Sequence, residues 1–157
     1  MTNIIHPLDS LSKEEIEKSI ALFKLDKNSD ENSVFSYITL EEPEKEFVKN
    51  FKSGDSFSRH SRIVGIDSNS QGFEVLIDLT REKVISSISL PEEAGPTYTM
   101  TEILTAIQLT LENEQYQEAL KKRGITDLNL IQIDPWPGGG IVNKNIKKGH
   151  RALKTIS

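Results

Sequence analysis

The stretch SRIVGIDSNSQGFEVLIDLTREKVISSISL, residues 61–90, decides the fold of the chain. It contains three short runs rich in β-branched residues, at 61–67, 72–79 and 83–90, separated by the turn-forming stretches DSNSQG and TREK. Apolar residues recur at every second position of the middle run, which is the period of a strand. The pattern predicts an antiparallel meander of three strands. The residues predicted to share one face are Phe73, Val75, Ile77 and Leu79 in the middle run and Val84, Ser86, Ile88 and Leu90 in the last.

A helix is predicted before the meander, over residues 12–25. Its start is marked by a capping box, in which the Ser12 hydroxyl accepts a hydrogen bond from the backbone N–H of Glu15 and the Glu15 carboxylate accepts one from Ser12. The residues on its apolar face are Ile16, Ile20 and Phe23.

Residues 34–54 add a strand and a second helix. The run VFSYITLEEP, residues 34–43, is rich in β-branched and aromatic residues, so it predicts a strand that ends at Pro43. Pro43 and the acidic residues after it are typical of a helix start. The order α-β-α-β-β-β predicts an α+β fold, in which a small antiparallel sheet carries a packed helix, as in cystatins. The residues on one side of the second helix are Phe47, Val48 and Phe51.

A second unit is predicted after the proline- and glycine-containing stretch PEEAGPTY, residues 91–98. The sequence thus divides into a first α+β domain over 1–91 and the start of a second α+β domain over 97–157. Thr99 and Glu102 form a second capping box, which predicts a helix. The apolar positions that follow are Ile103, Leu104, Ile107 and Leu111, and then Tyr116, Ala119 and Leu120 in a second helix or bent extension.

The end of the second unit predicts a strand over LNLIQID, residues 128–134, and then a Pro-Trp-Pro-Gly turn. In the second unit, as in the first, helices are predicted before a strand. However, no run of further strands is predicted after that strand. We therefore expect the second unit to be truncated.

Composition excludes several classes of function. The 157 residues include 36% apolar and 27% charged residues and no cysteine, so disulfides, thiolate metal sites and a cysteine nucleophile are excluded. The net charge is −5, and because residues 138–157 hold five basic residues and no acid, residues 1–137 carry −10. Such an acidic body argues against nucleic-acid binding. No apolar run approaches the roughly 18 residues of a membrane span, and no leader pattern is present, so we predict a cytoplasmic protein.

The residues that could carry chemistry are scattered. His6, His60 and His150 stand in three separate segments, whereas a copper or zinc site needs several imidazoles to converge. The run Gly138–Gly140 lacks the flanking pattern of a phosphate loop. Trp136 is interpreted as a packing plug rather than a platform for an aromatic ligand. We predict no catalytic, cofactor-binding or metal-binding residue in this chain.

Charged clusters are interpreted as solvated surface. The acid pairs lie at helix starts or in loops, where they interact with solvent and the helix dipole. The basic residues near the end form a solvated run that could also contact an acidic partner or the acidic body of this chain. The clusters are Glu14–Glu15, Glu41–Glu42 and Glu92–Glu93, and Lys144, Lys147, Lys148, Arg151 and Lys154.

Four segments, in order, resemble the N-terminal part of copper-containing primary amine oxidases. They are HPLDSLSKEEI (6–16), EEP (41–43), DLTREKVISSISLP (78–91) and RGITDLNLIQIDPWPGG (123–139). The resemblance covers nearly the whole chain. It implies two small α+β domains that precede a large β-sandwich catalytic domain, in a parent enzyme that converts primary amines to aldehyde, ammonia and hydrogen peroxide.

The resemblance also implies which chemistry this chain lacks. The family binds copper through a His-x-His pair and a third histidine, makes topaquinone from the tyrosine of an Asn-Tyr-(Asp/Glu) motif, and uses a distant aspartate as base. The chain has no His-x-His, and its tyrosines stand in SYI, TYT and QYQ. Copper, topaquinone and the dimer contacts are therefore expected only in the full-length parent, with its catalytic domain as this chain's partner.

Two other hypotheses remain open from sequence. The chain could be a stand-alone interaction module, derived from the family, that holds a partner through its sheet or basic end. It could also carry a hydrolytic or ligand-binding pocket in the concave face of the sheet.

Overall fold

Two compact units make up the chain, Met1–Pro96 and Thr97–Ser157. None of the helices in the described part of the chain is long and apolar enough to cross a membrane. The computed structural model describes residues 4–26, 29–91, 94–139, 146 and 151–157.

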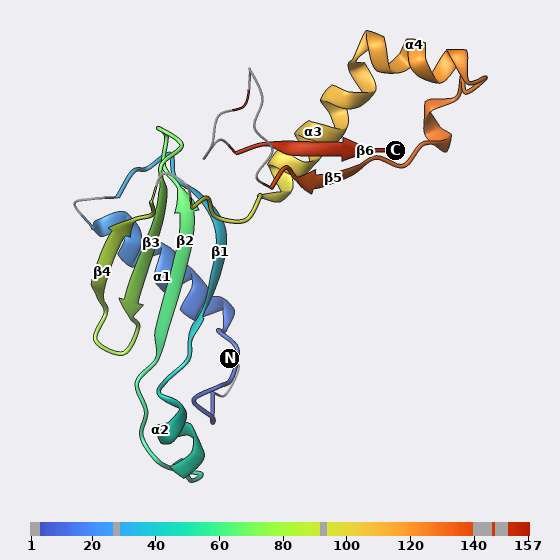
Figure 1. Ribbon diagram of the computed structural model, residues 1–157. Helices are drawn as coiled ribbons and strands as arrows, with labels where there is room; N and C mark the ends of the chain where they lie inside the picture. The colour runs from blue at the N-terminus through green and yellow to red at the C-terminus, as the bar shows by residue number, and fades with distance from the viewer. Residues whose placement is uncertain (1–3, 27–28, 92–93, 140–145, 147–150) are drawn as a thin grey trace. The chain divides into compact units, whose positions relative to one another are not determined.

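The first unit is an antiparallel meander with a helix across one face (Figure 1). Its elements are α1 (Lys13–Leu25), β1 (Val34–Glu41), α2 (Lys45–Asn50), β2 (His60–Ile66), β3 (Gly72–Asp78) and β4 (Lys83–Ser89). The sheet order is β1-β2-β3-β4, and every neighbouring pair is antiparallel. The predicted α+β class, with one packed helix on a small antiparallel sheet, is confirmed.

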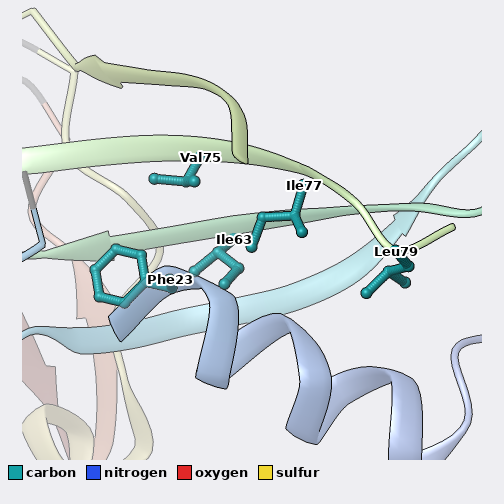
Figure 2. Close-up of a cluster of buried hydrophobic side chains, with 5 residues drawn as sticks. All are labelled: Phe23, Ile63, Val75, Ile77 and Leu79. Atoms are coloured by element: carbon teal, nitrogen blue, oxygen red, sulfur yellow. The ribbon is translucent and has the colours of Figure 1, made fainter. Parts of the chain in front are cut away.

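The core lies between α1 and the sheet (Figure 2). Phe23 of α1 meets Ile63 of β2, Val75 and Ile77 of β3, and Leu79 just after β3. Ile63 and Ile77 have no exposed surface. The predicted alternation along β3 is confirmed, because its odd-numbered apolar residues form this face.

The face that α1 turns to the sheet agrees with the predicted one at Phe23 but not at Ile16 and Ile20. Ser19 and Phe23 are its buried residues, whereas Ile16 and Ile20 are only half-buried. The Ser19 hydroxyl lies 2.7 Å from the hydroxyl of Ser61 in β2. Because serine is small and this pair satisfies both buried hydroxyls, a polar residue occupies the centre of the contact face, and the apolar residues flank it.

The predicted face of β4 is wrong beyond its first residue. Ile77 pairs with Val84, but Leu76 pairs with Ser86, so Ile85 is an extra residue in a β-bulge. A bulge shifts the alternation by one residue, which reverses the faces that follow it. Val84 therefore packs on the core. The residues turned to the outer face are Ser86 and Ile88.

The second unit contains two helices, a 3-10 turn and a two-stranded sheet. Its elements are α3 (Met100–Glu112), α4 (Glu114–Lys122), η1 (Leu128–Leu130), β5 (Asp134–Pro137) and β6 (Leu153–Ile156). The capping box of Thr99 and Glu102 is confirmed at the start of α3. Of the predicted apolar positions of α3, Ile103, Ile107 and Leu111 are half-buried, whereas Leu104 is 57% exposed.

The strand predicted over residues 128–134 is wrong. The Asp127 carboxylate accepts hydrogen bonds from the backbone N–H of Asn129 at 3.0 Å and from its side-chain amide at 2.9 Å, which starts a 3-10 turn instead. The strand begins only at Asp134 and includes the Pro-Trp-Pro residues that were predicted as a turn. Proline is tolerated there because a two-stranded sheet consists of edge strands only.

Candidate functional site

The histidines do not form a metal site in the described part of the chain. His6 packs edge-on against Phe51, with ring centroids 5.1 Å apart, and its Nδ1 accepts a hydrogen bond from the backbone N–H of Leu8. His60 lies in β2, with its Nε2 3.6 Å from a carboxylate oxygen of Asp78. His150 lies outside the described residues.

Copper needs a convergent set of donor groups. The described residues contain no group of three or more His, Cys, Asp or Glu side chains that could hold a metal ion. The described residues therefore do not fit the copper centre of the resembled oxidases.

The N-terminal motif is held against the sheet by Arg59. The guanidinium donates to both carboxylate oxygens of Glu15, at 2.9 and 3.0 Å, and to the carbonyl oxygens of Pro7 at 3.0 Å and Ser10 at 3.3 Å. Glu15 also closes the capping box of α1 with Ser12, as predicted. Pro7 is fully buried and Arg59 is 7% exposed. The residues of the HPLDSLSKEE segment therefore stabilise the fold through their contacts with Arg59.

The protonation of Glu15 is linked to this contact. Burial opposes ionisation of the carboxyl, but the Arg59 guanidinium and the Ser12 backbone N–H outweigh burial and lower the pKa of Glu15. From sequence, Glu15 was interpreted as a capping residue and as one member of a solvated acid pair, and its pairing with Arg59 corrects the second interpretation. Its second partner, Arg59, lies 44 positions further along the chain, so no local sequence pattern predicts the contact.

The Asp-Leu segment at the end of β3 forms a second structural contact. Asp78 is 1% exposed and accepts a hydrogen bond of 2.8 Å from the backbone N–H of Arg81, which shapes the turn into β4. Its burial raises the pKa, but that hydrogen bond and the charges of His60 and Arg81 outweigh burial, so the pKa of Asp78 is lowered.

This lowered pKa predicts a pH dependence of stability. A carboxyl whose pKa is lower in the folded state contributes stability above its unfolded pKa, and the contribution is lost as the pH falls through the folded value. We expect the free energy of unfolding to fall as the pH drops below about 4, and to fall less steeply in Asp78→Asn. Urea unfolding at a series of acidic pH values checks this. If the free energy of unfolding fell with pH equally steeply in the wild type and in the variant, the prediction would be contradicted.

Trp136 is not a packing plug. It is 59% exposed, and in β5 it pairs with Lys154 of β6. The adjacent pair, Pro135 and Thr155, faces α3, since the Thr155 hydroxyl accepts a hydrogen bond of 3.1 Å from Thr110. Because side chains alternate along a strand, the pair that includes Trp136 points away from α3.

The glycine run begins with a close backbone contact. The N–H of Gly138 donates to the carbonyl oxygen of Ala152 at 2.7 Å, and a Cβ at Gly138 would lie 2.9 Å from that oxygen. Gly139 has φ +60°, and Gly140 lies outside the described residues. The glycine at 138 allows the approach of β5 and β6.

The charged clusters are partly structural. Arg151 donates to Glu102 from Nη2, at 2.8 and 2.9 Å, and from Nε, at 3.2 Å, and its guanidinium lies 4.4 Å from the ring centroid of Tyr98. Glu41 lies neither at a helix start nor in a loop, because it is the last residue of β1, where its carboxylate pairs with Arg62. The clustered residues that lie outside the described part are Lys144, Lys147, Lys148, Glu92 and Glu93.

A groove of about 700 Å³ lies in the first unit, on the sheet face opposite α1. β3 and β4 contribute Leu76 and Ile85, α2 contributes Phe47, and the segment between α2 and β2 contributes Phe57. Ile85 reaches the groove because it occupies the bulge of β4. The groove is a candidate binding site among the described residues of this unit.

The rim of the groove is acidic. Glu41, Glu42 and Glu44 line it, together with His60. Glu41 is neutralised by Arg62, which donates to its carboxylate at 2.6 and 2.7 Å and lowers the pKa of Glu41. The segment between β1 and α2 thus places acids beside apolar side chains.

Arg62 is a further residue that sequence reasoning missed. It joins two carboxylates across the outer face of the sheet, since it also lies 2.6 Å from Glu74. In the sequence, Arg62 stands in an apolar run with no acid beside it. The pairing of Arg62 with the two carboxylates becomes visible only when β1, β2 and β3 are placed in register.

Comparison with known proteins identifies the family of this chain. Residues 6–90 match the family model of the copper amine oxidase N2 domain. The chain belongs to the copper amine oxidase family. It represents the N-terminal small-domain region of these oxidases, and that resemblance is confirmed.

Relatives in this family are much longer. The chain is 28% identical to a primary amine oxidase of Arthrobacter sp. (strain P1), over 99% of this chain and 24% of that protein. It is 33% identical to a primary amine oxidase of Pisum sativum, over 83% of this chain and 19% of that protein. The chain therefore spans about a quarter or less of these copper amine oxidases.

A solved structure shares the fold. The copper-containing benzylamine oxidase from Hansenula polymorpha aligns with a TM-score of 0.65 and 19% sequence identity, over 86% of this chain and 22% of that chain. At this identity the likeness concerns the fold alone.

Proposed function

We propose that the chain is a supporting, non-catalytic region of a copper amine oxidase. The parent reaction would be the oxidative deamination of primary amines to aldehyde, ammonia and hydrogen peroxide. Copper and topaquinone would reside in a catalytic domain outside these 157 residues, and this domain would be the chain's partner within a homodimer.

One observation carries this proposal: the family's N-terminal motif is used for folding. Asp9 accepts hydrogen bonds from the backbone N–H groups of Ile5 and His6, at 2.9 and 2.8 Å, and so closes the turn that Arg59 holds. Together with the family match over residues 6–90, this favours a scaffold role over a catalytic one. We also propose that the two small domains divide between residues 91 and 97.

The form of the protein in its source cells tests the proposal. An antibody against this chain is used to blot a lysate, and the same lanes are stained for quinone by redox cycling. We expect a band far larger than 17.7 kDa that stains for quinone. A lone band near the mass of this chain, without quinone stain, would contradict the proposal.

A further inference from the structure

We propose that the groove between α2 and the outer face of the sheet binds an extended peptide segment of another protein, one that carries lysine or arginine beside apolar side chains. This inference goes beyond the proposed function and does not depend on it. It rests on the shape, exposed apolar surface and charge of the groove within the first unit.

The groove keeps apolar surface open to solvent. Phe47 is 40% exposed and Ile85 is 47% exposed, and both line it. Phe57 is held in place at its edge by Phe51, with ring centroids 5.6 Å apart. Lysine and arginine side chains have apolar stems that lie well along such surfaces while their charged ends reach a polar rim.

The negative charge of the rim favours an occupant with positive charge. Glu42 and Glu44 form no ion pair with any residue that the structure describes, and both line the groove. Arg62 does not neutralise them, because it is already held between Glu41 and Glu74. Two uncompensated carboxylates above an apolar surface complement a ligand that is both cationic and apolar.

The size of the groove favours a peptide over a single small cation. Its volume of about 700 Å³ lies within the range of roughly 300–1,000 Å³ that is typical of ligand sites. An isolated ammonium ion would leave most of the apolar surface uncovered. A segment with one basic and one apolar side chain would cover both Phe47 and Ile85.

Fluorescence anisotropy of the purified 157-residue chain tests this directly. The probe is a short fluorescein-labelled peptide that alternates lysine with leucine, and the comparison probe has glutamate in place of each lysine. We expect only the basic probe to bind, and its affinity to fall as salt is added. Equal binding of both probes, or no binding of the basic probe, would overturn the proposal.

Variants assign the binding to the groove. Glu42→Gln/Glu44→Gln removes both free carboxylates. We expect it to lower the affinity for the basic probe about fivefold, the effect of losing two exposed ion pairs. The matched control, Glu31→Gln/Glu118→Gln, makes the same change in charge at exposed residues outside the groove and should leave affinity unchanged. Equal losses in the two variants would show binding to net charge alone and overturn the proposal.

A third variant tests the apolar part of the groove. Ile85→Ser shortens an exposed side chain, so the fold should persist, which far-UV circular dichroism checks. We expect about threefold weaker binding from the lost apolar contact. Butylamine serves as a competitor: if it displaces the probe as well as an unlabelled copy of the peptide does, the site takes small amines and the peptide assignment fails.

Discussion

Replacing Arg59 with alanine is expected to destabilise the first unit by about 3–5 kcal/mol, the typical cost of removing one partner of a buried ion pair. Arg59 is 7% exposed, and its guanidinium donates to Glu15, Pro7 and Ser10. Its loss would leave the half-buried carboxylate of Glu15 without its cation and would release the N-terminal segment. The effect should therefore exceed that of any exposed ion pair in the chain.

Urea unfolding followed by far-UV circular dichroism measures this loss. Arg81→Ala is the matched control, because Arg81 also faces a carboxylate, Asp78 at 3.6 Å, but its side chain is 71% exposed. We expect the control to cost at most about 1 kcal/mol. If Arg59→Ala cost no more than the control, the structural reading of the N-terminal motif would be wrong.

Shortening Ile63 to alanine is the second large effect that we expect. Ile63 has no exposed surface and lies at the centre of the contact between α1 and the sheet. Removing its outer carbons loses their burial and leaves a cavity, which costs about 2–5 kcal/mol for such substitutions. Because Phe23 and Ile77 belong to the same cluster, the loss should loosen α1 as well as β2.

The control for this prediction is Ile88→Ala, which makes the same chemical change on the outer face, where Ile88 is 53% exposed. Its cost should stay below about 1 kcal/mol, as expected for an exposed position. Hydrogen exchange of the α1 and β2 amides adds a local readout. If the two variants lost similar amounts of unfolding free energy, or if hydrogen exchange in α1 did not change in Ile63→Ala, Ile63 would not lie at the centre of the core.

The first unit was predictable where the signal is local. The capping box of Ser12 and Glu15 and the alternation along β3 each depend on residues a few positions apart, and both are confirmed. The bulge at Ile85 left only an ambiguous mark, because Val84 and Ile85 are both apolar and Ser86 and Ser87 are both polar, so the break in alternation does not show which residue is extra. Only pairing with β3 reveals it.

The second unit was less predictable because short-range side-chain contacts override the apolar pattern. The Asp127 carboxylate draws the following residues into a 3-10 turn, although LNLIQID alternates like a strand. Trp136 is a residue type that is highly buried on average, yet only one face of the small β5–β6 sheet meets α3, and Trp136 is on the other.

The groove could not have been found from sequence. It combines a bulged residue of β4, an exposed face of α2 and a rim whose charge depends on which acid Arg62 neutralises. Each contribution is set by long-range pairing. The acid pair Glu41–Glu42 was visible as a pair, but only the structure separates its bound member from its free one.

The central claim, that this chain is a scaffold and its family's chemistry lies elsewhere, is tested most directly by copper loading. The purified chain is incubated with Cu(II), passed over a chelating resin and analysed for copper by mass spectrometry, and a peroxide-coupled assay with methylamine follows. We predict no stoichiometric copper and no amine-dependent peroxide. Tightly bound copper at one ion per chain, with peroxide formation that requires amine, would contradict the account.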